Sequence, residues 1–179
     1  IGYIEITTGA TAGEWDNAPT KIQIMGPGVK RSGDVVQVQS YQTGANASGA
    51  TAMPDDNSIP QITEGDEYMT LAITPTSAIN NLIIVASFFG GNSVSTMVAI
   101  ALFRDAVLNA LAATTGEASG LGWPVCEVLT HHMIAGTVSI ITFRLRVGAT
   151  GGGTVQFNGR NGANYNGVAA SSIRITEVM

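Results

Sequence analysis

The 179-residue sequence is long enough for one substantial domain, because single domains commonly contain about 100–200 residues. It carries a formal net charge of −5, 12% charged residues and no cluster of Lys or Arg, so it lacks the basic surface needed to bind a nucleic-acid backbone. The 22 glycines and the low charge content are typical of a turn-rich β protein that belongs to an assembled particle.

The cysteine content and the apolar runs exclude further classes. Cys126 is the only cysteine, which excludes an intrachain disulfide and a multi-cysteine zinc site, and we expect it to be a buried small hydrophobic residue. The longest apolar run, residues 82–89, is far shorter than the roughly 20 residues of a membrane-spanning helix. No charged-then-apolar leader opens the chain, so we expect no membrane insertion. Because residue 1 is Ile, we expect a processed product or part of a longer chain.

Residues 1–33 predict a short β element separate from the rest. Ile4 and Ile6 alternate with polar residues, as do Ile22 and Ile24, which predicts two short strands. The Gly/Pro/Ser cluster GPGVKRSGD then marks a boundary, since glycine and proline favour changes of chain direction. We therefore expect the end of a shaft or a linker domain at 1–33 and a β-sandwich domain at 34–179.

The central part of the chain contains three β-like runs with short connections. After a strand marked by Val36 and Val38 and a polar surface loop at 43–60, the runs at 68–74, 82–89 and 97–103 follow one another. The connections are too short for a crossover helix, so we expect antiparallel neighbours.

The runs at 82–89 and 97–103 are apolar on both faces, so something must cover both sides of each strand. One interpretation is a pair of central strands in a thick sandwich. The interpretation that we favour packs one face in the core and the other against identical subunits, because monomers seldom expose large apolar patches. The residues expected at this subunit interface are Ile83, Val85, Phe89, Val98, Ile100 and Leu102.

The second half of the chain continues the strand pattern. Residues 105–124 are the only candidate helix, and a strand followed by a loop fits them equally well. The runs 125–133 and 138–147 predict a hairpin, with alternate residues of the second strand facing inward, and a last strand places Ile173 and Ile175 inward. Short strands with regular turn signals and little helix predict an all-β fold, an antiparallel two-sheet sandwich of the jelly-roll kind.

The titratable residues give little sign of catalysis. His131 and His132 are adjacent in a strand, so their side chains point to opposite faces and cannot share one metal. The sequence contains no HExxH, GxSxG or phosphate-loop motif, so we expect no enzyme and no cofactor. A glycan depolymerase is the enzymatic alternative, with Glu117 and Glu127 as its only loose carboxylate candidates.

The acidic turn of Glu64, Asp66 and Glu67 has two interpretations. Closely spaced carboxylates can hold Ca²⁺ when carbonyl oxygens complete the shell, but the spacing of a dedicated calcium loop is absent. A solvated turn before a strand is the simpler interpretation, and we predict no metal site.

Two polar loops provide the candidate binding residues. The Asn/Gly-rich loop NGRNGANYNG combines a planar cation, amides and an aromatic ring, a mixture that suits polar ligands such as sugars. The SGLGWP loop adds a tryptophan, and neither loop precedes a helix that could bind phosphate. Ordinary loop structure or a subunit contact is the alternative for each. The candidate receptor-binding residues are Trp123, Arg160, Asn161, Asn164 and Tyr165.

Four strings occur in an order that resembles the C-terminal domains of tailed-bacteriophage tail fibres: IPQITEGDEYMTLAITPTSAINNLIIV, ALFRDAVLNALAA, AGTVSIITFRLRVG and FNGRNGANYNGVAASSIRITEV. The resemblance covers roughly residues 34–179. It implies a distal jelly-roll-like domain assembled as a homotrimer, located in the extracellular virion, that contacts other phage tail proteins and attaches to a host cell-surface glycan or protein. A capsid or decoration protein that stabilises a viral shell with the same sandwich is the alternative.

Overall fold

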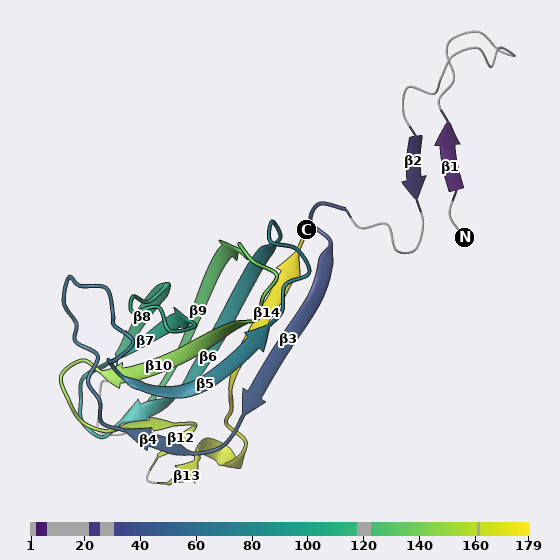
Figure 1. Cartoon of the computed structure of the whole chain (residues 1–179). Helices are drawn as coiled ribbons and strands as arrows, with labels where there is room; N and C mark the ends of the chain where they lie inside the picture. Colours follow the sequence, from purple (N-terminus) through teal and green to yellow (C-terminus); the bar gives the residue numbers. More distant parts are fainter. Residues whose placement is uncertain (1–2, 7–21, 26–30, 118–122, 161) are drawn as a thin grey trace, which may run out of the picture. The chain divides into compact units, whose positions relative to one another are not determined.

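The computed structural model describes residues 3–6, 22–25, 31–117, 123–160 and 162–179 (Figure 1). The chain divides into two compact units, Ile1–Asp34 and Val35–Met179. In the first unit, strands β1 (Tyr3–Ile6) and β2 (Ile22–Met25) pair antiparallel, with Tyr3 opposite Met25. Both strands lie where the alternation of isoleucine with polar residues predicts them.

The second unit is built from two antiparallel sheets. The first sheet has the order β3-β14-β6-β9, and the second has the order β5-β10-β7-β8. The strands are β3 (Val35–Thr43), β5 (Asp66–Ile73), β6 (Asn81–Asn92), β7 (Met97–Arg104), β8 (Ala112–Glu117), β9 (Pro124–Ile134), β10 (Ile141–Ala149) and β14 (Ser171–Val178). Short strands β4 (Ala47–Gly49) and β11 (Val155–Phe157) extend the first sheet, and β12 (Gly159–Arg160) pairs with β13 (Ala163–Asn164) before the 3₁₀ turn η1 (Tyr165–Gly167).

This strand order is that of a jelly roll, in which two Greek keys form eight strands in two sheets. The all-β, two-sheet, jelly-roll prediction is therefore confirmed. The expected pairing of successive strands is wrong, because β5, β6 and β7 alternate between the sheets and β9 and β10 form no hairpin. Instead β9 pairs with β6, and β10 lies between β5 and β7. Short connections can bridge two facing sheets as readily as two neighbouring strands.

The main core lies between the two sheets and follows the strand alternation. In β10 the inward residues Ile141, Phe143, Leu145 and Val147 are fully buried, as the sequence predicts. The first sheet contributes alternate residues of its central strands β6 and β14, including Ile84 and Ile175. Large aliphatic and aromatic side chains from both sheets pack against each other in one contiguous apolar layer.

A second, smaller core covers the outer face of β7 and corrects one expectation. Ala99, Ala101 and Phe103 pack there against Met53, which is fully buried although it lies in the segment expected to be a surface loop. Gly148 on β10 makes this possible, because a Cβ there would lie 2.7 Å from the carbonyl oxygen of Thr51.

The opposite side of β7 faces the main core. Val98, Ile100 and Leu102 are 0–1% exposed, so their own chain buries them and they are not available to a subunit interface. The two-sided apolar pattern of this strand reflects a connection folded over it, which the sequence does not distinguish from a neighbouring subunit.

The described residues that follow β7, 105–117, form no α-helix. Asp105 has a positive φ of 52°, and its carboxylate accepts a hydrogen bond from the backbone N–H of Thr142 at 2.8 Å. This fixes a reversal that leads into strand β8, which is the strand alternative of the sequence interpretation. None of the described residues forms a helix with the length and apolar character to cross a bilayer.

Candidate functional site

The connections at one end of the sandwich are held together by Asn158. This residue is completely buried with a φ of 61°, and its side-chain amide donates to the carbonyl oxygens of Thr43 and Ala45 at 2.8 and 3.0 Å. Its side-chain oxygen accepts from the hydroxyl of Ser171 at 2.7 Å. Its backbone N–H donates to the carbonyl oxygen of Phe89 at 2.7 Å. One asparagine therefore ties the β3–β4 connection, β6 and the start of β14 into a rigid base.

A small polar pocket lies at this end, which we call the loop end and define by β4, β12, β13 and η1 (Figure 1). The pocket has a volume of about 230 Å³. The side-chain amides of Asn46 and Asn164 contact each other, and Asn164 donates to the carbonyl oxygen of Gly44 at 2.6 Å. The lining residues are Asn46, Ala47, Ser48, Gln156 and Gly162, all of which are uncharged.

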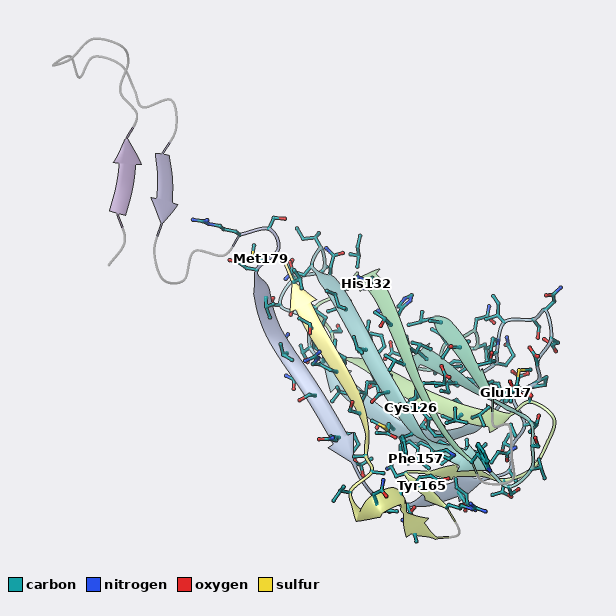
Figure 2. The ribbon with its side chains drawn as sticks, turned by 180° about the vertical axis from the view of Figure 1, so that it is seen from behind. Glu117, Cys126, His132, Phe157, Tyr165 and Met179 are labelled. Carbon is teal, nitrogen blue, oxygen red and sulfur yellow. The ribbon has the colours of Figure 1, made fainter. Side chains whose placement is uncertain are left out.

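Besides Asn164, two of the predicted binding residues, Arg160 and Tyr165, belong to the elements of the loop end. Tyr165, labelled in Figure 2, is half-buried. Its ring lies at 90° to that of Phe89, and the ring centroids are 5.3 Å apart. Burial raises the pKa of its hydroxyl, and the positive charge of Arg160 opposes that rise. Arg160 is exposed on β12, which pairs with β13, and its guanidinium makes no hydrogen bond or ion pair with the described residues. Asn161 lies outside the described residues.

Trp123 lies at the same end but beside a different strand. Its side chain is 61% exposed, just before β9, whose first residue Pro124 is opposite Gly91 of β6. Strand β11 pairs with the same stretch of β6, so the two elements flank that strand. The structure therefore brings Arg160, Asn164 and Tyr165 into one loop cluster and leaves Trp123 across β6 from it.

Among the described residues, the contact found on the outer face of the first sheet is that of Tyr165, which packs against Phe89 at the loop end. The central strand β6 of this sheet presents Ile83, Val85 and Phe89, each partly exposed, as the sequence predicts for an interface. On β9 the outward residues include Val128 and Ile134, which are 56% and 61% exposed.

Cys126 also lies on this outer face, opposite Phe89 (Figure 2). It is exposed, so the expectation of a buried cysteine is wrong. The position is outward because residues 125 and 129 occupy the buried side of the alternating strand.

The three carboxylates of the acidic turn, Glu64, Asp66 and Glu67, interact with different residues. Asp66 accepts hydrogen bonds from the backbone and hydroxyl of Thr51 at 3.0 and 2.9 Å, and Glu64 accepts from the backbone of Gln61. Glu67 forms an ion pair with Arg144 at 3.0 Å. Across the described ranges no three His, Cys, Asp or Glu side chains are grouped in a way that could hold a metal ion.

The other titratable candidates are similarly dispersed. His131 is half-buried and His132 exposed, so their side chains point to opposite faces as predicted. The pKa of His131 is lowered mainly by burial and, to a smaller extent, by the charge of the neighbouring His132. Glu117 is exposed on β8, while Glu127 on β9 lies against Gly116.

Sequence reasoning missed the most engaged carboxylate, that of Glu177. It is fully buried and accepts hydrogen bonds from Gln37, Thr76 and Asn80 at 2.6, 2.8 and 2.7 Å. Burial raises its pKa, but the hydrogen bonds outweigh burial, so the pKa lies below its ordinary value. The signal was available, because Glu177 continues the inward series of Ile173 and Ile175.

The fold and the site define this chain as an antiparallel jelly-roll domain with a polar loop end and one uncovered sheet face. The family model of the Pgp3 C-terminal domain matches residues 48–179, so the chain belongs to that family. The matching model is not one of phage tail fibres, the family that the four sequence strings resemble. No curated protein matches the chain.

Several solved structures share the β architecture at low similarity. Dimeric latent PorU from Porphyromonas gingivalis is 8% identical with a TM-score of 0.45, over 84% of this chain and 13% of that one. A structure of infectious bursal disease virus, Gx strain, is 12% identical with a TM-score of 0.39, over 99% and 38%. The enzymatically active domain of bacteriophage CBA120 tailspike protein 4 is 15% identical with a TM-score of 0.26, over 68% and 18%. The chain thus spans well under half the length of each neighbour, and such scores carry no functional argument.

Proposed function

We propose that this domain is a non-catalytic attachment module that binds a cell-surface glycan through its loop end. The observation that carries the proposal is the loop end itself, where Asn158 fixes a base beneath a pocket of amide and hydroxyl groups. Uncharged planar amides bind the hydroxyl groups of sugars in both directions, because each amide offers donors and acceptors. Arg160 adds an exposed guanidinium, whose positive charge acts on the hydroxyl of the half-buried Tyr165.

The uncovered outer face supports self-association as part of the same function. Ile83, Phe89, Val128 and Ile134 lie together on β6 and β9 and are partly or largely exposed. Exposed apolar residues that gather on one face mark interaction surfaces, and the partner that the chain itself supplies is another copy. We propose that copies of this chain associate through this face as a homotrimer in an extracellular virion.

The dispersed carboxylates favour binding over catalysis. A glycan depolymerase needs two carboxyl groups about 5–10 Å apart in a groove. Glu64, Asp66, Glu67 and Glu177 are each engaged with other residues of the chain. Among the described residues, Glu117 and Glu127 stay the candidates for the enzymatic alternative, and Glu127 lies against Gly116, the residue before Glu117.

The test is a screen of the whole chain against uncharged cell-surface glycans, followed by two variants. Ser48→Trp fills the pocket from an exposed position, and Arg160→Ala removes the guanidinium; we expect each to weaken binding by about tenfold or more. Arg174→Ala, which removes the other unpaired arginine on a different surface, is the matched control and keeps wild-type affinity.

Three outcomes would contradict the proposal. They are no binding by the wild type, equal binding by the Ser48→Trp variant, and release of oligosaccharides from the glycan. A regular lattice of the purified chain without glycan binding would support the capsid or decoration alternative.

A further inference from the structure

A shallow groove lies on the outer face of the first sheet, over β3 and β14 and away from the loop end. Its volume is about 390 Å³, within the range of about 300–1,000 Å³ that is usual for small-molecule sites. It occupies the polar half of this face, whereas the apolar residues proposed for self-association lie on β6 and β9. The lining residues are Ser40, Tyr41, Gln42, Val85, Ser172, Ile173 and Arg174, and none of them is acidic.

Arg174 is the only charged residue that lines this groove. It is exposed on a central strand, where the register places it between Ser40 of β3 and Val85 of β6. Its guanidinium makes no hydrogen bond or ion pair with the residues that the structure describes. A sheet face with neither carboxylate nor carbonyl partner for this group leaves all five donors of the guanidinium to solvent or to a ligand.

The arginines of the second sheet provide the contrast. Arg144 pairs with Glu67 at 3.0 Å and donates to the carbonyl oxygen of Asp105 at 2.9 Å. Arg146 donates to the carbonyl oxygens of Glu64 and Gly65 at 2.9 and 2.7 Å. Arg144 and Arg146 therefore stabilise the fold through their hydrogen bonds. Arg174 makes no such hydrogen bond with the described residues, so the same structural role does not explain its presence.

Neutral hydrogen-bonding groups surround Arg174. The hydroxyl groups of Ser172 and Ser87 are 2.8 Å apart, and each keeps further hydrogen-bonding capacity because a hydroxyl has one donor and two acceptor positions. Ser40 and Gln42 lie along the neighbouring strand and are exposed. The groove therefore offers one fixed positive charge within a row of hydroxyl and amide groups.

We propose that this groove binds a carboxylate-bearing sugar, such as a uronic acid unit of an acidic glycan. A guanidinium pairs with a planar carboxylate through two parallel hydrogen bonds, and the serine and glutamine side chains match the ring hydroxyls. The groove has a single cation on a chain of net charge −5, so it lacks the row of basic residues that a nucleic-acid backbone needs. The site is independent of the uncharged-glycan site proposed at the loop end.

The experiment measures binding of a uronic-acid tetrasaccharide to the whole chain by calorimetry and by amide chemical-shift changes. The carboxyl-reduced tetrasaccharide is the neutral probe. We expect the reduced sugar to bind at least about tenfold more weakly, because a charge-assisted hydrogen bond contributes more than a neutral one. Arg174→Gln should cause a similar loss for the acidic sugar, and Arg174→Lys a smaller one, because lysine keeps the charge and loses the two-point geometry.

Arg104→Gln is the matched control, since it removes an arginine of β7 in the second sheet, outside both proposed sites, and should leave binding of the acidic sugar unchanged. Arg160→Gln shows whether the acidic sugar binds at the loop end instead of in this groove. Shift changes should centre on Ser40, Gln42 and Ser172. The proposal is overturned by equal binding of the two tetrasaccharides, by an Arg174→Gln variant of wild-type affinity, or by a loss caused by Arg160→Gln instead. Because the loop-end screen uses uncharged glycans, failure of one site is separate from failure of the other.

Discussion

The outer faces of β7 and β6 start from the same sequence pattern and end in different environments. Both strands are apolar on both sides, yet the chain folds its own β4–β5 connection over β7 and buries Met53 there completely. Over β6 the described residues provide only the ring of Tyr165, which packs against Phe89 at one end, and Ile83, Val85 and Phe89 stay partly exposed. A strand that is apolar on both sides therefore indicates that both of its faces are covered. Only the fold shows which face is covered by another segment of the same chain.

The largest expected effect tests the internal partner. Met53→Ala removes a completely buried side chain from the second core and should lower the free energy of unfolding by about 2–5 kcal/mol, because a cavity adds to the lost burial. Ile83→Ala on the uncovered face should cost about 1 kcal/mol or less within one subunit, since its side chain is partly exposed already. Denaturant unfolding at low protein concentration measures both. Equal costs would show that the connection does not seal β7.

The second expected effect on stability concerns Glu177, whose hydrogen-bond donors belong to the same chain. Glu177→Gln leaves several donors with a weaker acceptor and should cost about 1–3 kcal/mol at neutral pH. The pKa of the folded carboxylate lies below its ordinary value of 4.5, so the wild type is stabilised above that pH. This stabilisation should be lost as the pH falls through the lowered folded value.

Urea unfolding between pH 7 and pH 3 measures this effect. The Glu177→Gln variant should show a shallower loss of stability with falling pH than the wild type. Glu117→Gln on β8 is the matched control, because Glu117 is exposed and should leave both the stability and its pH dependence unchanged. A control variant that loses as much stability as Glu177→Gln would contradict the role of burial.

The sequence predicts the strands far better than it predicts their partners. Alternation in β10 and β14 identifies the buried residues correctly, because the two-residue period is set by local backbone geometry. Strand neighbours depend on long-range topology, so the hairpin expected from β9 and β10 is wrong. The candidate site follows the same division: the Asn/Gly-rich loop is visible in the sequence, but the Asn46–Asn164 contact joins segments 118 residues apart.

Three residues whose environments were not predicted, Met53, Arg174 and Glu177, are only weakly marked by the alternation of apolar and polar residues in the sequence. Met53 stands in a polar stretch where a single apolar residue has no periodic partner. Arg174 and Glu177 stand on opposite faces of one strand, and the alternation places the first outside and the second inside. Only the structure shows that several donors bind the carboxylate of Glu177, whereas the guanidinium of Arg174 has no acceptor among the described residues.

The smallest expected effect on folding stability tests the external partner of β6. Val128→Lys places a charge on the uncovered face at a position that is 56% exposed, so the unfolding free energy of the subunit should change by no more than about 0.5 kcal/mol. The same substitution should lower the solution mass from that of the proposed trimer to that of a monomer, because an interface core cannot bury an unpaired ammonium group. Light scattering across a concentration series measures the mass, and Ile79→Lys, at an 82% exposed position outside this face, is the control. A wild type that stays monomeric at high concentration would show that the exposed face of β6 and β9 does not bind another copy of the chain. The difference between the two strands would then be that the chain covers the outer face of β7, whereas solvent covers that of β6.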